Sequence, residues 1–177
     1  AQHFVNDNPT KQDVDYITKA WEVGNGDLVQ IHTAVIERAI TSDEPKFQWP
    51  MTWLFHVIRL SGATYFEGWD ELEEYNRGVM HARNIFKELG QSFWHERQPN
   101  GYPLDKNEWL SGEMFERRIR FADAIYSGGN PTSTPDEIMD RIGANESTRS
   151  LVNNFKHRKD QFIALMCSPE IMGLENA

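Results

Sequence analysis

The segment from Gln91 to Asn107 holds the residues best suited to bind a ligand. It breaks every helical period, contains the turn sequence Pro99-Asn-Gly-Tyr-Pro103, and is long for a connection inside a compact domain. Because aromatic rings offer flat faces to a sugar ring or a partner side chain, one interpretation is a ligand-binding shelf there. Its residues are Trp94, His95, Tyr102 and Trp109. The interpretation that we favour is a compact loop whose aromatic side chains plug into the core.

Three arginines close together in the sequence form a second candidate site. Arg117, Arg118 and Arg120 can bind an anion or an acidic partner, since guanidinium groups pair with carboxylates and phosphates through two parallel hydrogen bonds. The interpretation that we favour is ion pairing within one helix. Glu113 stands four residues before Arg117, and Glu116 stands four before Arg120, the spacing at which helical side chains meet.

Residues for metal binding or nucleophilic catalysis form no recognisable motif. His81, His95 and Glu96 have suitable side chains, but their spacing matches no zinc motif, so we predict no metal and no cofactor. The sequence has neither a nucleophile elbow nor a glycine-rich phosphate loop. Its one cysteine, Cys167, excludes an intrachain disulfide and lies in an apolar run where a thiol is usually inert. No enzymatic activity is assigned on this basis.

Composition and charge exclude several classes of protein. The chain has 177 residues and a net charge of −9, which argues against nucleic acid and anionic lipid as partners. With 39% hydrophobic and 12% aromatic residues it is not an intrinsically disordered chain. No segment is long and apolar enough to span a membrane. We therefore expect one folded domain over residues 1–177.

Helical spacing and capping residues recur along the chain, whereas the alternation typical of strands does not. We therefore predict an all-α fold with about seven helices, packed as an irregular orthogonal bundle, and one long aromatic-rich loop at about 91–107. The expected helices run from Thr10 to Gly24, Asp27 to Ala39, Pro50 to Gly62, about Asp70 to Gly90, Glu108 or Ser111 to Tyr126, Thr134 to Gly143, and about Ser147 to Cys167. A flexible loop is expected at 127–133.

Four sequence blocks, in order along the chain, resemble the C-terminal part of the bacterial domain-of-unknown-function 1800 family. They are His3-Phe-Val-Asn-Asp-Asn-Pro9 with Gly26-Asp-Leu28; Lys46-Phe-Gln-Trp-Pro50 with Arg59-Leu-Ser-Gly-Ala63; Leu89-Gly-Gln91 with Pro99-Asn-Gly-Tyr102 and Trp109-Leu110; and Arg118-Ile-Arg-Phe-Ala122 with Ser168-Pro-Glu170. The resemblance implies a largely helical fold, export to the periplasm or outside the cell, and a longer protein of which this chain is the last part. It also implies a second secreted protein, similar to sulfatases and phosphatases, as a partner. It carries no catalytic residues.

Together these observations favour a structural or protein-interaction module. Its expected partners are the missing N-terminal part of its own chain and the sulfatase-like or phosphatase-like protein. The alternative is a carbohydrate-binding protein or an enzyme whose site, lined by the 91–109 stretch, is completed by the missing N-terminal region.

Overall fold

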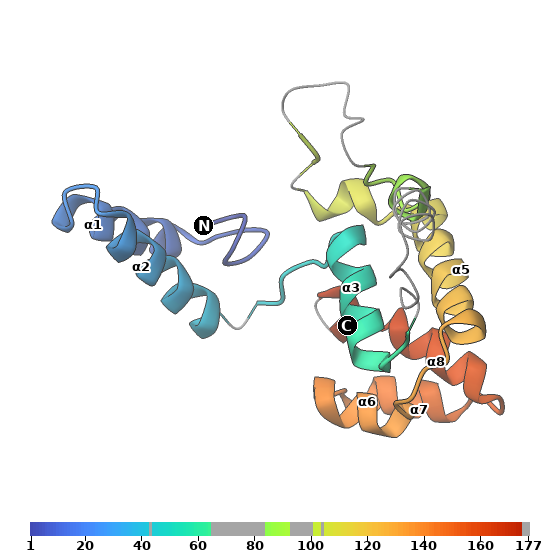
Figure 1. Ribbon diagram of the computed structural model, residues 1–177. Coiled ribbons are helices and arrows are strands. Elements are labelled where there is room, and N and C mark those ends of the chain that lie inside the picture. The colour runs from blue at the N-terminus through green and yellow to red at the C-terminus, as the bar shows by residue number, and fades with distance from the viewer. Residues whose placement is uncertain (43, 65–83, 93–100, 104, 175–177) are drawn as a thin grey trace.

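The computed structural model describes residues 1–42, 44–64, 84–92, 101–103 and 105–174. Over these residues every regular element is a helix and no strand occurs, which confirms the all-α prediction. The helices are α1 (Lys11–Val23), α2 (Leu28–Thr41), α3 (Pro50–Ser61), the short 3₁₀ helix η1 (Lys106–Trp109), α5 (Gly112–Gly128), α6 (Pro135–Ile142), α7 (Glu146–Asn153), α8 (Arg158–Met166) and α9 (Pro169–Met172) (Figure 1). Residues 84–88 are also helical.

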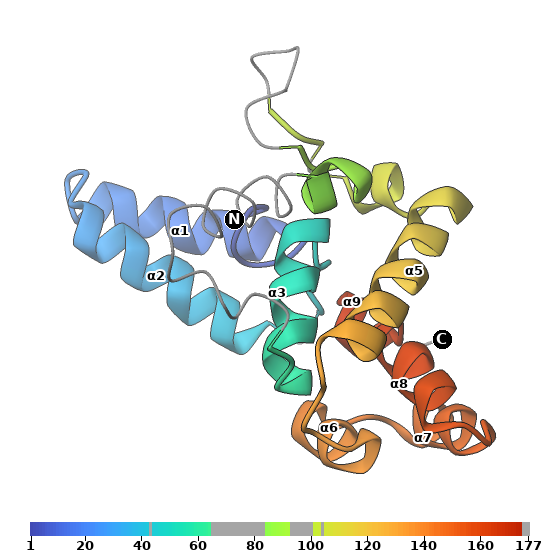
Figure 2. The ribbon, with the colours of Figure 1, turned by 45° about the vertical axis from the view of Figure 1, so that its right-hand side comes forward.

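The elements form a helical body and a hairpin that projects from it. The helices α1 and α2 lie side by side and stand to one side of the body in both Figure 1 and Figure 2. In the body, α8 packs on α5, α6 and α7, while α3 contacts α5 and α9. In both views α6 crosses beyond the ends of α3 and α5. The body is therefore the irregular bundle that the sequence predicts.

Helix boundaries follow the capping residues closely. Thr10 and Asp13 form a reciprocal capping box, in which Asp13 N donates to Thr10 Oγ1 (3.2 Å) and Thr10 N donates to Asp13 Oδ2 (2.8 Å). Thr134 and Glu137 form the same arrangement at the start of α6. These side chains satisfy backbone N–H groups that the first helical turn leaves unpaired.

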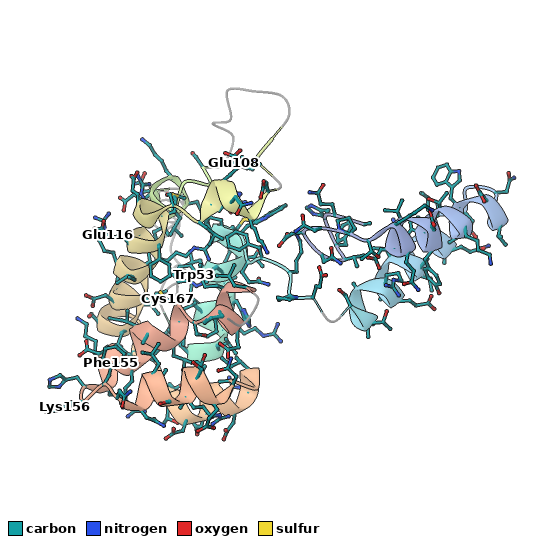
Figure 3. The ribbon with its side chains drawn as sticks, turned by 180° about the vertical axis from the view of Figure 1, so that it is seen from behind. Trp53, Glu108, Glu116, Phe155, Lys156 and Cys167 are labelled. Atoms are coloured by element: carbon teal, nitrogen blue, oxygen red, sulfur yellow. The ribbon has the colours of Figure 1, made fainter. Side chains whose placement is uncertain are left out.

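The core of the body is built around Trp53. Its side chain is fully buried, and its indole N–H donates to the carbonyl oxygen of Met166 at 2.9 Å. Figure 3 shows Trp53 among the helices of the body, with Cys167 next to it in this view. Around it lie buried side chains from α3, α5, α6, α8 and α9, namely Leu54, Val57, Ile125, Ile138, Leu165, Met166 and Ile171. The apolar stripes of these helices close on one another, as their periodicity predicts.

The prediction of one continuous helix from about Ser147 to Cys167 is wrong, because the chain turns between α7 and α8. The N–H of Asn154 donates to the carbonyls of Ser150 and Leu151, both at 3.2 Å, and ends α7. The turn lets α7 pack against α8, so Val152 and Phe162 reach the same core. It leaves Leu151 and Phe155 exposed, although in one continuous helix their spacing would place them on the same face as the buried Phe162.

The structure describes only parts of the fourth predicted helix and of the long predicted loop. Residues 84–88 of the fourth predicted helix are helical, and the helix ends near Gly90, whose φ of 85° is left-handed. Residues 70–83 of this predicted helix lie outside the described ranges. The predicted loop ends earlier than Asn107, because η1 begins at Lys106, where the Asp105 side chain accepts a hydrogen bond from Asn107 N. Residues 93–100 and 104 of this loop are not described.

Candidate interaction surface

The α1–α2 hairpin buries very little of itself. Along α1 only Asp13 is buried, and along α2 only Ala34. Val14, Trp21 and Leu28 belong to the apolar stripes of these two helices, yet all three side chains are exposed. The reason is geometric: each helix covers only a narrow strip of the other, and the rest of each apolar stripe lies outside that contact.

Large apolar side chains are therefore exposed on more than one side of the hairpin. In α2, the consecutive residues Ala34, Val35 and Ile36 point about 100° apart, so one neighbouring helix cannot cover all three. Ala34 is buried, whereas Ile36 is 56% exposed. The exposed apolar residues of the hairpin are Val14, Tyr16, Trp21, Val23, Leu28, Val29, Ile36 and Ile40. A helix with apolar residues around most of its circumference is typical of a buried helix.

One side of the hairpin is hollowed into a groove of about 400 Å³ between the two helices. The hydroxyl of Tyr16 donates to Glu37 Oε2 at 2.7 Å, which ties the two walls together. The lining residues are Tyr16, Lys19, Ala20, Val23, Val29, Gln30, Thr33, Ala34 and Glu37. Grooves of this kind, apolar with a few polar groups at the rim, are suited to receive an apolar helix face.

A carboxylate holds the two helices together. Arg38 Nε donates to Asp13 Oδ1 at 2.8 Å, and Arg38 Nη2 pairs with the same oxygen. The hydrogen bonds from Thr10, followed by those from Arg38, lower the pKa of Asp13 to about 2. Its carboxylate therefore stays ionised at neutral and mildly acidic pH. Because the folded-state pKa is depressed, this stabilisation is lost only as the pH falls from about 4 toward 2.

The base of the hairpin is fixed to the body through Asp7. Its buried carboxylate accepts a hydrogen bond from Phe47 N at 3.0 Å and forms an ion pair with Lys46. The ring of His3 packs edge-on against Trp49, with centroids 5.2 Å apart. The N-terminal segment and the connection between α2 and α3 are thus bonded together at the base of the hairpin.

The predicted aromatic shelf is described only at Tyr102 and Trp109. Trp109 is only 5% exposed, and its indole N–H donates to Pro103 O at 3.0 Å. Tyr102 is half-buried, donates to Ser92 O, and packs against Trp109 with the rings tilted and their centroids 5.8 Å apart. Trp109 belongs to the core, and the partly exposed Tyr102 packs against it, as in a loop whose rings plug into the core. Trp94 and His95 lie outside the described residues, so their part in ligand binding stays a prediction.

The structure does not bring the three predicted arginines together. Arg117 and Arg120 lie on the outer side of α5 and line a pocket of about 460 Å³ with Glu88 and Phe121. Arg117 pairs with Glu113 at 2.5 Å, and Arg120 lies 3.7 Å from Glu116. The predicted ion pairs within the helix are therefore present. Anion binding by these two residues stays a prediction.

Arg118 instead points into the core. Its side chain is 1% exposed, and Arg118 Nη2 donates to Gln48 O at 2.9 Å. The guanidinium lies over the rings of Phe47 and Trp53, at 5.1 and 5.3 Å from their centroids. Burial lowers the pKa of Arg118 to about 10, so it remains charged at neutral pH and contributes cation–π contacts within the core.

The remaining reactive side chains show no catalytic arrangement in the described part of the chain. Burial raises the pKa of Cys167 to about 12, which keeps its thiol protonated. No three His, Cys, Asp or Glu side chains among residues the structure describes come close enough to share a metal ion. His81, His95 and Glu96 lie outside those residues. In the same ranges no helix has the length and apolar character needed to cross a membrane.

The four sequence blocks that resemble the family converge on the connection at 46–51. Asp7 bonds to Phe47 N, and Gln91 Oε1 accepts a hydrogen bond from Met51 N at 2.8 Å. Arg118 donates to Gln48 O, and Gln48 N donates to Met172 O at 2.9 Å, two residues beyond the last block. Blocks that are far apart in sequence thus form one continuous contact around this short segment.

A comparison with protein families confirms the resemblance. The model of the family described as "Protein of unknown function (DUF1800)" matches residues 1–172. The chain belongs to the DUF1800 family. No curated protein and no solved structure matches it.

The match has a structural consequence for the hairpin. Because it begins at residue 1, it includes α1 and α2 as well as the helical body. The hairpin is therefore part of the DUF1800 region and not an unrelated extension. Its exposed apolar residues are a property of this DUF1800 domain that needs an explanation.

Proposed function

We propose that this DUF1800 chain is a structural, protein-binding module of an exported bacterial protein, and that the α1–α2 hairpin is its docking element. The observation that carries the proposal is the exposure of large apolar side chains on two sides of a hairpin whose base is fixed. Burying a side chain such as Leu, Val or Ile is worth about 1.5–3 kcal/mol, so leaving this many exposed is costly unless a partner covers them.

The partner that best suits such a hairpin is the N-terminal part of a longer chain of the same protein. A flat partner would cover one side, whereas helices of a surrounding fold can cover both the groove and the Trp21 side. The sulfatase-like or phosphatase-like secreted protein is the second proposed partner, on the basis of the family resemblance alone. Export is proposed on the same basis.

The test compares two substitutions on α1 in two contexts. In the full-length protein we expect Trp21→Glu to lower the free energy of unfolding by about 2 kcal/mol or more, because a buried aromatic anchor is replaced by a charge. In the 177-residue chain alone, where Trp21 is 56% exposed, the same change is expected to cost about 0.5 kcal/mol or less. Denaturant unfolding followed by far-UV circular dichroism measures both values.

The matched control is Thr18→Glu, which places the same charge at an exposed position one turn away. It is expected to have a small effect in both contexts. An equal, small effect of Trp21→Glu in both contexts would contradict the proposal. So would a dimer of the 177-residue chain, seen by sedimentation and lost in Trp21→Glu, since the hairpin would then serve a second copy.

A further inference from the structure

A small cleft lies where α6 begins, beside the turn between α7 and α8. Its volume is about 290 Å³. The lining residues are Tyr126, Asn130, Pro131, Ser133, Pro135, Arg158 and Phe162. Figure 3 shows this outer corner of the body, where Phe155 and Lys156 precede Arg158. The cleft combines a cation, a hydroxyl, an amide and aromatic rings, which is the composition of a site for a small polar ligand.

The rim of the cleft is bonded to the body, although the sequence predicts a flexible loop at 127–133. The N–H groups of Thr132 and Ser133 both donate to Ser61 O at 3.0 Å, and Thr64 N donates to Gly129 O at 2.8 Å. Asn130 has a left-handed φ of 45°, a conformation that asparagine tolerates better than most residues. The rim is therefore held in place before any ligand arrives, which reduces the entropy lost on binding.

Arg158 differs from the other arginines near a pocket. Arg117 and Arg120 each pair with a glutamate of the same helix. Within the part of the chain that the structure describes, no carboxylate lies within ion-pair distance of Arg158. The Glu137 carboxylate is close enough to attract Arg158 electrostatically, but its hydrogen bonds go to the helix cap, where it accepts from Thr134 N (2.7 Å) and Thr134 Oγ1 (3.0 Å). The Arg158 guanidinium is thus available to an external anion.

The wall opposite a bound anion would be aromatic. Tyr126 and Phe162 pack with ring centroids 5.3 Å apart, and Phe162 is buried beneath the half-buried Tyr126. The two rings are tilted by 53°, and Tyr126 lines the cleft together with Arg158 and the polar rim. A ligand with an acidic group on a compact ring can use all three parts at once.

We propose that this cleft binds a small organic anion: its carboxylate or phosphate pairs with Arg158, its ring lies against Tyr126, and its hydroxyl groups bond to Asn130 and Ser133. The proposal is independent of the hairpin, which lies on the other side of the molecule (Figure 1).

The test is isothermal titration of the 177-residue chain with three probes: glucuronate, glucose as its neutral counterpart, and inorganic phosphate. We expect binding of glucuronate and none of glucose at concentrations up to tens of millimolar. Phosphate shows which anionic group the cleft recognises. Binding of phosphate but not glucuronate assigns the site to phosphate groups, and binding of glucuronate but not phosphate assigns it to carboxylates. Backbone amide shifts at Asn130 and Ser133 in NMR spectra locate the site.

Two charge-removing variants complete the test. Arg158→Gln is expected to weaken binding about tenfold or more, because a hydrogen-bonded ion pair to the ligand is lost. Lys156→Gln removes the same charge at an exposed position outside the cleft and is expected to leave the affinity unchanged. Absence of binding by both anions, equal binding of glucose, or equal weakening by the two variants would overturn the proposal.

Discussion

Replacing Trp53 by alanine is expected to lower the free energy of unfolding by about 3–5 kcal/mol, a large part of the stability of an ordinary domain. The side chain is fully buried at the centre of the body, and its removal leaves a cavity between α3, α5 and α8. It also leaves the carbonyl of Met166 without its indole donor and removes one of the two rings that hold Arg118. Denaturant unfolding with a two-state fit measures the change.

The matched control is Trp21→Ala, which removes the same side chain from the hairpin. Because Trp21 makes little contact in this chain, we expect its loss to change the stability by about 0.5 kcal/mol or less. Comparing the two substitutions distinguishes a tryptophan that packs in the core from one that is available to a binding partner. Similar costs for both substitutions would show that Trp21 is already packed within this chain.

Gly173→Ala is the second substitution with a large expected effect. Gly173 follows α9 with a left-handed φ of 66°, and a Cβ there would overlap the carbonyl oxygen of Lys46 and lie 3.1 Å from Gln48 N. The chain would have to move away from the 46–48 segment, and the hydrogen bond from Gln48 N to Met172 O would break. We expect a cost of about 3 kcal/mol or more, combining backbone strain with lost packing.

Gly143→Ala is its control. Gly143 ends α6 with nearly the same φ, 62°, but a Cβ there would meet no atom within 4 Å. Its expected cost is about 1–2 kcal/mol, the penalty of a left-handed conformation for a residue with a Cβ. Thermal and denaturant unfolding of both variants measure the difference. Equal costs would mean that the contact between the C-terminal helix and the 46–48 segment does not stabilise the body.

Local signals predicted the helix ends because capping depends on a few neighbouring residues. Thr10, Asp27 and Thr134 cap helices as expected, and Ser111, one of the two starts considered for α5, caps that helix. The break between α7 and α8 was missed, since the apolar spacing of 151, 155, 162 and 166 also fits one continuous helix. The available signal was the pair Asn153 and Asn154, because asparagine is a poor helix former and favours turns.

Burial could not be predicted as well as helicity. The sequence shows which residues are apolar, but burial depends on which other elements cover them, so the exposed stripes of α1 and α2 were unexpected. For Arg118 a signal did exist. It shares one face of α5 with Ala122 and Ile125, at the spacing of residues that point toward the core. Arg158 could not be singled out, because only the fold brings it beside Tyr126 and Ser133.

Hydrogen–deuterium exchange of the hairpin tests the docking role most directly. Amides of α1 and α2 would be compared in the 177-residue chain and in the full-length protein, with the amides of α8 as an internal reference. The docking role predicts much slower exchange of the hairpin amides in the full-length protein and unchanged exchange in α8. Equal exchange of the hairpin in the two proteins would contradict it.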